Sequence, residues 1–382
     1  MVAQVTRRAV LAAAAAGAGL VAALPPGREQ AFAASAEDRA TQVVDSMDLV
    51  QQVGQLLAAG VPFGHVTTAG HLVDWYRVGT VFWSGRSHGG VAALAQDNAE
   101  LQRHATVDAT RGVLVYVAVD QEGGAVQSLR GPGVSDIPSA LAQSSQDAAT
   151  IRYRSALWGR QLRRAGVTLD LAPVTGPVPY DNRERNQPIG RYDREFGYTG
   201  AAVAEAVGPW VQGSLSAGVQ PTLKHFPGLG RVVQNTDTHF HVVDDSTTRS
   251  AETLVPWRAG VAAGAGCIMV SSAIYARIDP RGQAFLNSTV VTGMIRQDLG
   301  FDGVVMTDDV GNAEAVRDVP VPDRATRFVR AGGDLVLTLD VGQVRTMRNA
   351  LYSAATEDQA FRRRVRESAI RVVTMKVRSG LA

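Results

Sequence analysis

The sequence of 382 residues predicts an α/β fold: a single-domain (β/α)8 barrel of the TIM type in residues 36–382, after an N-terminal export signal. Two observations predict this fold. Eight short apolar runs recur along the chain, and segments of helical length separate them. Parallel strands buried on both faces read as continuous Val, Ile and Leu runs, as these do. Eight such units in about 345 residues fit one barrel with extended loops. Periodicity alone leaves a doubly wound parallel sheet open as the alternative.

The predicted elements follow one another in regular order. The apolar runs predict strands at residues 55–59, 79–83, 113–119, 167–171, 219–223, 267–271, 303–307 and 334–339. Amphipathic patterns between them predict helices, the clearest at residues 91–105, 147–165, 198–217 and 289–299. Residues 340–381 read as helix with a basic face, and we interpret its run Arg362-Arg363-Arg364 as solvated surface.

Residues 1–35 read as a bacterial twin-arginine export signal. Arg7 and Arg8 precede apolar residues, an alanine-rich run covers residues 11–24, and Ala31-Phe32-Ala33 supplies small residues suited to cleavage. A membrane anchor is the alternative, but the run is short and alanine-rich for a span that needs about 20 apolar residues. We therefore expect a secreted or cell-envelope protein whose mature part does not span the membrane.

Composition excludes several classes of function. With 45% hydrophobic and 19% charged residues, the chain resembles an ordinary soluble globular protein. Residues 36–382 contain 35 basic and 35 acidic side chains, and this neutral balance argues against nucleic acid or an anionic membrane surface as the main partner. Cys267 is the only cysteine, so an intrachain disulfide and a cysteine-cluster metal site are excluded. We expect a monomer.

Two unusually long connections, residues 173–198 and 225–249, follow predicted strands. Long loops in a compact domain are usually functional or disordered, and in a barrel these two would lie on the face where active sites form. Aromatic residues that could stack on a sugar ring are also present, although packing in the core or on the surface explains them equally well: Trp75, Trp83 and Tyr192.

Polar residues collect where the predicted strands end: Asp120, Asp170, Lys224, His225, Asp308 and Asp309. A lone Asp after a strand is usually a helix cap, but several residues at equivalent strand ends converge on one pocket in a barrel. The chain has only two lysines against 36 arginines, so Lys224 fits a position that needs a compact ammonium group.

Asp308 and Asp309 place two carboxylates at one turn. Successive side chains point to different sides, so one can attack an electrophilic carbon while the other caps the next helix. In the connection at residues 225–249, which follows the fifth predicted strand, Asp237-Thr238-His239 places a carboxylate two residues from an imidazole. The carboxylate can fix the imidazole tautomer and raise the basicity of the ring.

The sequence predicts neither a metal nor a cofactor. The pair His239 and His241 has a spacing found in metal sites, but the chain shows no clear third ligand and no HExxH motif. The glycine pairs at 123–124 and in the turn 228–230 lack the pattern of a phosphate-binding loop.

Four motifs occur in order: Asp120-Gln-Glu-Gly-Gly, Lys224-His-Phe-Pro-Gly, a strand that ends in Ser271-Ser272, and Gly303-Val-Val-Met-Thr-Asp308-Asp309. Together they resemble the bacterial single-domain members of glycoside hydrolase family 3, the β-N-acetylglucosaminidases of the NagZ type, over roughly residues 45–345. The family's fold is a (β/α)8 barrel. The resemblance implies retaining hydrolysis of a terminal β-linked N-acetylglucosamine, without a cofactor.

The resemblance also implies roles for residues. It makes Asp308 the nucleophile that forms a covalent glycosyl-enzyme, and it maps an Asp–His acid/base pair onto Asp237 and His239. Sugar binding falls to Asp120, Lys224, His225 and Arg194, with Arg191 as the reserve for the arginine.

The chain departs from the family pattern at four points. Leu229 stands where a second histidine is usual, and the interval from His225 to His239 is two residues longer than usual. Ser128 stands where an arginine is common, and only Arg130 lies near. The segment 190–197 that holds the expected arginine is also longer than its family pattern. These departures concern the loops and the aglycone side more than the nucleophile.

The sequence thus leads us to expect an exported retaining exo-β-N-acetylglucosaminidase acting on cell-wall muropeptides, chitin fragments or glycoconjugates. Three alternatives stay open. A β-glucosidase of this fold usually takes its acid/base from a further domain, a phosphorylase would use phosphate in place of water, and a non-catalytic exported protein would only bind the sugar.

Overall fold

A computed structural model describes residues 26–250 and 252–382 of the chain. The predicted export signal therefore lies largely outside the described residues, and only its end appears, as the beginning of helix α1 (Pro26–Asp45). The chain divides into two units, Met1–Ser35 and Ala36–Ala382, and the fold below is that of the second.

Eight parallel strands form the centre of this unit in the order β12-β9-β7-β6-β3-β2-β1-β13. The sheet closes because β12 also pairs with the start of β13 through a parallel bridge between Met306 and Leu335, where Thr307 N donates to Leu335 O at 3.0 Å. Closure confirms the predicted (β/α)8 barrel and excludes the doubly wound sheet. The strands are β1 (Leu57–Pro62), β2 (Thr80–Ser84), β3 (Tyr116–Val119), β6 (Leu169–Asp170), β7 (Gln220–Phe226), β9 (Cys267–Val270), β12 (Val304–Thr307) and β13 (Val336–Thr338).

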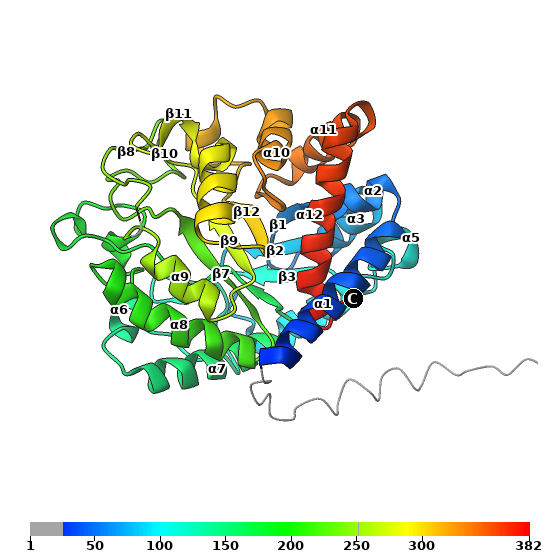
Figure 1. The fold of residues 1–382 in the computed structure, drawn as a ribbon. Helices are drawn as coiled ribbons and strands as arrows, with labels where there is room; N and C mark the ends of the chain where they lie inside the picture. The colour runs from blue at the N-terminus through cyan, green and yellow to red at the C-terminus, as the bar shows by residue number, and fades with distance from the viewer. Residues whose placement is uncertain (1–25, 251) are drawn as a thin grey trace, which may run out of the picture. The chain divides into compact units, whose positions relative to one another are not determined.

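Helices surround the strands (Figure 1). Neighbouring pairs pack side by side, among them α7 with α8, α8 with α9, and α10 with α11. The helices are α2 (Leu49–Gln55), α3 (Val66–Tyr76), α4 (Gly90–Gln102), α5 (Val107–Thr110), α6 (Ala140–Gln143), α7 (Ala148–Arg164), α8 (Gly200–Ser216), α9 (Val255–Ala262), α10 (Val321–Arg330), α11 (Val344–Glu357) and α12 (Gln359–Arg378), with a π-helix η4 (Thr289–Asp298). Within the described residues, no helix is both long and apolar enough to cross a bilayer.

The structure adjusts several predicted boundaries. The first strand begins at Leu57, later than predicted, because the preceding residues form α2, which Asp48 opens with a capping box completed by Gln51. The predicted C-terminal helix is two helices, because Asp358 ends α11 and its side chain caps the first backbone N–H groups of α12. The predicted helix at 289–299 is the π-helix η4.

Alternation along the strands divides the apolar residues into two cores. On β12, Val304 and Met306 belong to a small cluster inside the barrel, whereas Val305 belongs to the larger cluster between strands and helices. The end of α12 closes the barrel interior at the amino ends of the strands, where Met375 packs into the inner cluster. The opposite end of the barrel, where the strands finish, is left for polar side chains.

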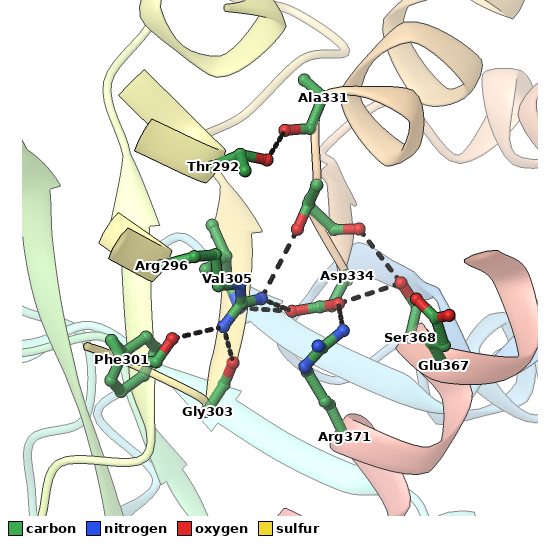
Figure 2. Close-up of polar contacts among 12 residues, drawn as sticks. Thr292, Arg296, Phe301, Gly303, Val305, Ala331, Asp334, Glu367, Ser368 and Arg371 are labelled. Carbon is green, nitrogen blue, oxygen red and sulfur yellow. Dashed lines mark hydrogen bonds and ion pairs between the residues drawn. The ribbon is translucent and has the colours of Figure 1, made fainter. Parts of the chain in front are cut away.

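A buried polar cluster lies at the start of β13, at the end of the barrel away from the strand carboxyl ends (Figure 2). Asp334 is fully buried and accepts hydrogen bonds from Ser368 Oγ at 2.9 Å and Arg364 Nη2 at 2.6 Å. Arg296, from η4, pairs with the other carboxylate oxygen, and Arg371 Nη1 lies at 3.4 Å. One carboxylate therefore joins η4, the β13 strand and α12.

Short strands outside the barrel lie in the loops that follow the carboxyl ends of the barrel strands. A hairpin of β4 (Gln121–Gly123) and β5 (Val126–Gln127) follows directly after β3. A separate sheet of β8 (Val243–Asp244), β10 (Ile274–Tyr275) and β11 (Asp279–Gln283) joins the fifth and sixth strand–helix loops. The strand prediction did not include these five segments, which are short and carry little apolar periodicity.

Candidate active site

A cavity of about 340 Å³ opens at the carboxyl ends of the barrel strands. Its lining contains six of the seven residues predicted for the site, and His239 is the exception. The cavity is lined by Phe82, Asp120, Leu171, Pro188, Arg194, Lys224, His225, Leu229, Asn235, Thr236, Asp237, Met269, Asp308, Asp309, Asn312, Ala313, Leu337 and Leu339.

Strand alternation explains why the predicted residues converge. Met306 faces the barrel interior, and Asp308, two residues further, continues on the same side. Asp120 extends β3 in the same manner. On β7, Leu223 belongs to the outer cluster, so Lys224 points inward. The prediction that polar strand ends meet in one pocket is therefore confirmed for these three residues.

Lys224 and Arg194 are held by two carboxylates. Lys224 Nζ lies 2.6 Å from Asp120 Oδ1 and 2.7 Å from Glu122 Oε1. Arg194 donates to Glu122 through both Nε, at 2.8 Å, and Nη2, at 2.7 Å, and its Nη1 donates to Pro188 O at 2.6 Å. Glu122 is not among the predicted site residues, although it lies two residues after Asp120 in the same motif and so on the same side of an extended chain.

The ion pairs keep Glu122, Lys224 and Arg194 in their charged forms. Burial tends to raise the pKa of Glu122, but Arg194 and Lys224 outweigh it and lower that pKa to about 2. Burial also tends to lower the pKa of Lys224, yet Asp120 and Glu122 raise it above its ordinary value. Lys224 and Arg194 therefore both remain charged.

Arg191, the reserve candidate for the sugar-binding arginine, is exposed and does not line the cavity.

Asp308 lies at the end of β12, and one of its carboxylate oxygens has no hydrogen-bond partner among the residues that the structure describes. Its Oδ1 accepts a hydrogen bond from Asp309 N at 2.8 Å, and its Oδ2 lies 3.9 Å from His225 Nε2. Burial, and after it the nearby Asp237, raises the pKa of Asp308 to about 7. With a pKa near 7, this carboxyl group is partly anionic at neutral pH.

His225 is buried beside the two cations. Burial and the neighbouring Lys224 lower the pKa of His225 well below its ordinary value, so the imidazole is neutral. Its Nδ1 has no hydrogen-bond partner among the described residues. The peptide bond between Lys224 and His225 is cis. A neutral, partly unsatisfied imidazole at a cavity wall suits a hydrogen bond to a ligand hydroxyl.

Asp309 has a supporting position. Its carboxylate accepts backbone hydrogen bonds from Gly311 at 2.8 Å, Asn312 at 3.0 Å and Leu339 at 2.8 Å. The prediction that one of the two aspartates caps the next helix is therefore wrong, because the next helical turn, at residues 314–316, has Ala313 at its N-cap. Asp309 closes a tight turn and ties it to the end of β13, since no helix begins there.

The Asp237–His239 pair is not formed in this structure. Asp237 lines the cavity, and its partial removal from water raises its pKa, an effect that Arg194 opposes. His239 lies outside the lining, and its Nδ1 is 2.9 Å from Thr238 Oγ1. The structure therefore brings Asp237 to the site but does not bring His239 there.

The segment that carries these two residues is fastened to the 3-10 turn η5 (Glu314–Val316). Backbone N–H groups of Glu314 and Ala315 donate to the carbonyls of Asp237 at 3.1 Å and Thr236 at 3.0 Å. The guanidinium of Arg317 lies 4.3 Å from the centre of the Phe240 ring. These contacts hold Asp237 over the cavity, with the His239 ring turned toward its own loop.

Other candidates from the sequence lie elsewhere. Asp170 is buried behind the site, where it accepts from Gln121 N at 3.0 Å, and burial raises its pKa to about 8. Trp83 is fully buried and donates to Asn98 at 2.7 Å, so it is a core residue. Arg130 binds Gly124 O and Asp136 outside the cavity lining. Trp75 and Tyr192 are exposed surface residues, and neither lines the cavity.

Within residues 26–250 and 252–382, no cluster of three or more His, Cys, Asp or Glu is arranged to hold a metal ion.

Comparison with known proteins places this arrangement in a family. Residues 48–375 match the glycosyl hydrolase family 3 N terminal domain. A β-hexosaminidase of Stenotrophomonas maltophilia (strain K279a) is 36% identical over 230 residues, which span 58% of this chain and 66% of that protein, just under two thirds of its length.

Solved structures agree. The crystal structure of a β-N-acetylhexosaminidase from Beutenbergia cavernae is 41% identical with a TM-score of 0.85, and the match covers 87% of this chain and 99% of that one. A glycoside hydrolase family 3 β-N-acetylglucosaminidase from Paenibacillus is 29% identical with a TM-score of 0.79, covering 88% of this chain and 63% of that one. The chain therefore belongs to glycoside hydrolase family 3 and groups with the β-hexosaminidases of that family.

Proposed function

We propose that this protein is a retaining exo-β-N-acetylglucosaminidase that releases terminal β-linked N-acetylglucosamine from cell-wall muropeptides, chitin fragments or glycoconjugates. The observation that carries the proposal is the meeting of Asp308 with Asp120, Lys224, Arg194 and His225 in one cavity. A cavity of about 340 Å³ suits one pyranose ring better than a long glycan, which favours removal of a single terminal sugar. The similarity to β-hexosaminidases supports the N-acetylated sugar.

In the proposed reaction Asp308 attacks the anomeric carbon and forms an ester with it, while the bond to the leaving oxygen breaks. His239 donates the proton that this oxygen needs. Water then attacks the same carbon, gives its proton to His239 and releases Asp308. Two displacements at one carbon retain the β configuration. Because His239 lies outside the cavity lining, the proposal requires its loop to rearrange when substrate binds.

Asp237 is a second candidate for the acid. It already lines the cavity, and its raised pKa keeps a larger fraction protonated than an ordinary aspartate would have. In this case His239 would have no part in proton transfer. The two assignments predict different losses in single variants.

The first test is Asp308→Asn with 4-nitrophenyl N-acetyl-β-glucosaminide. Loss of the nucleophile is expected to lower kcat by about 10⁴-fold or more, on the scale of removing other catalytic nucleophiles. Undiminished turnover would remove Asp308 from this role.

Assays with and without inorganic phosphate distinguish hydrolysis from phosphorolysis, and the matching aryl β-glucoside tests the glucosidase alternative.

The second test separates the two acids. His239→Ala and Asp237→Ala are each measured with the aryl substrate and with a disaccharide whose leaving group is poor. Loss of the true acid hurts the poor leaving group far more, because 4-nitrophenol needs little protonation. An equal loss on both substrates in His239→Ala would contradict its proposed role.

We further propose export through the twin-arginine pathway, on the basis of Arg7, Arg8 and the apolar run behind them. Replacing Arg7 and Arg8 with lysine in the full chain should leave the protein inside the producing cell, as fractionation would reveal. Unchanged appearance outside the cytoplasm would refute this route.

A further inference from the structure

Glu122 lies behind the cavity wall and contacts both cations that face the cavity. Its side chain is 4% exposed, and it is absent from the cavity lining. Its Oε1 lies 2.7 Å from Lys224 Nζ and 2.7 Å from Arg194 Nη2, and its Oε2 accepts from Arg194 Nε at 2.8 Å. In the described part of the chain, it is the one carboxylate hydrogen-bonded to both cations.

We propose that Glu122 is a positioning residue, which orients Lys224 and Arg194 toward the hydroxyl groups of the terminal sugar without touching the sugar. This inference rests on the function proposed above and adds a residue to it. Without Glu122, each cation would keep one hydrogen-bond partner among the described residues: Asp120 for Lys224, and the carbonyl oxygen of Pro188 for Arg194.

Counting donors shows what the arrangement presents to a ligand. An ammonium group has three N–H donors, of which Lys224 uses two on Asp120 and Glu122. A guanidinium group has five, of which Arg194 uses two on Glu122 and one on Pro188 O. In the part of the chain that the structure describes, one donor of Lys224, two of Arg194 and the second oxygen of Asp120 remain without a partner. Neighbouring sugar hydroxyls, which both donate and accept, can pair with such a set.

Charge gives Glu122 a second effect. Lys224 and Arg194 approach the same carboxylate oxygen, so without the negative charge they would repel each other across a short distance. The bidentate pair also locks the plane of the Arg194 guanidinium, which a single hydrogen bond would leave free to rotate. Both effects act on sugar binding through other side chains.

The test uses Glu122→Gln, which keeps the size of the side chain but removes its charge. Its amide nitrogen cannot accept from either cation, so KM for the aryl N-acetyl-β-glucosaminide should rise about tenfold or more, with a smaller change in kcat. In an Arg194→Ala background the same substitution should add much less, because its partner is already absent. Additive losses would indicate a purely structural role and overturn the proposal.

Glu195→Gln is the matched control. Glu195 is also a fully buried glutamate, adjoining Arg194 in sequence, but neither of its oxygens has a hydrogen-bond partner among the described residues. Its replacement should leave KM unchanged. If Glu122→Gln does not fold, Glu122→Asp keeps the charge but shortens the reach to the two cations, and it should still raise KM; an unchanged KM would contradict the proposal.

A second readout needs no turnover. The chain has only two lysines, so lysine labelled with ¹³C at Cε gives two signals, from Lys224 and Lys376. Lys376, buried at the far end of the barrel, has a pKa lowered by burial to about 7 and serves as an internal reference. Glu122→Gln should lower the pKa of Lys224 and leave that of Lys376 in place.

The two readouts separate the two proposals. If the wild type fails to cleave any N-acetyl-β-glucosaminide while Glu122→Gln still lowers the pKa of Lys224, the proposed function fails and the positioning of the cations stands. If the wild type is active but Glu122→Gln changes neither KM nor the Lys224 titration, the positioning role is refuted and the proposed function stands.

Discussion

Asp308 is an unusual carboxylate because burial, and after it the charge of Asp237, raises its pKa to about 7. In the proposed reaction Asp308 is the nucleophile, which must be anionic to attack, so its protonated form would be inactive. The fraction of active enzyme therefore falls as pH decreases through this value.

We accordingly expect kcat/KM of the free enzyme to fall on the acidic side with an apparent pKa near 7. Asp237→Asn removes a neighbouring negative charge, so this acidic limb should move to lower pH, even if the variant is slower overall. The measurement is kcat/KM for the aryl substrate from pH 4 to 9 in both proteins. An acidic limb that stays in place in Asp237→Asn would show that Asp237 does not influence the nucleophile. His241→Ala, in the same loop but outside the cavity lining, should leave the limb unchanged.

At the scale of elements, two loops build one wall of the cavity, and Asn186 joins them. It is fully buried, and its Nδ2 donates to Leu229 O and Val232 O, each at 2.7 Å. Its Oδ1 accepts from the backbone of Ile189 at 3.0 Å and Gly190 at 2.7 Å. One amide therefore fixes the loop after β6, which carries Arg194, against the loop after β7.

Asn186→Asp keeps the shape but loses both donors, and two carbonyl groups would face a carboxyl group. We expect a loss of about 2–4 kcal/mol in the free energy of unfolding, since buried polar groups lose their partners. KM should also rise because the Arg194 loop loses its anchor. Urea unfolding and steady-state kinetics measure the two effects. Asn349→Asp, on the exposed side of α11, is the control and should change neither. A normal KM in a destabilised Asn186→Asp would separate loop anchoring from sugar binding.

The eight barrel strands could be predicted because burial on both faces leaves a run of apolar residues that no loop imitates. The hairpin β4–β5 could not, because its few residues are polar and glycine-rich and take their shape from the turn after Asp120. The π-helix η4 could not be distinguished from an α-helix, because its sequence is amphipathic at the α-helical period.

The site shows the same division. Asp308, Asp120 and Lys224 follow directly from strand ends, and strand alternation places them without knowledge of the loops. Glu122 escaped notice because its importance lies in two partners that are distant in sequence. The placement of His239 depends on which contacts its loop makes with η5, and no local pattern encodes that choice.

At the scale of the whole molecule, the candidate active-site cavity and the buried cluster around Asp334 lie at opposite ends of the barrel. The cavity lies at the carboxyl ends of the strands, whereas Asp334 and its arginines join η4, the start of β13 and α12 at the other end (Figure 2). Burial tends to raise the pKa of Asp334, but Arg296 and Arg364 outweigh it and hold that pKa below its ordinary value. The stabilisation from this charge is therefore fully present above about pH 4 and is lost as pH falls through the lowered value.

Asp334→Asn should destabilise the fold strongly without affecting sugar binding. It leaves Arg296 and Arg364, both largely buried, without their counter-ion, and breaking a buried ion pair on one side costs about 3–5 kcal/mol. Below the unfolding transition KM and kcat should match the wild type, because the hydrogen bonds and ion pairs that Asp334 forms with described residues involve none of the residues that line the cavity. Asp308→Asn is the reverse case, with turnover lost and stability kept. Urea unfolding at pH 7 and kinetics at 20 °C compare the two variants. Near-equal losses of activity in both would show that the two ends of the barrel are coupled, and so would contradict this division. The difference in stability between Asp334→Asn and the wild type should also shrink as pH falls from about 4, because the unfolded chain takes up its proton there while the native carboxylate, with its lowered pKa, is still ionised.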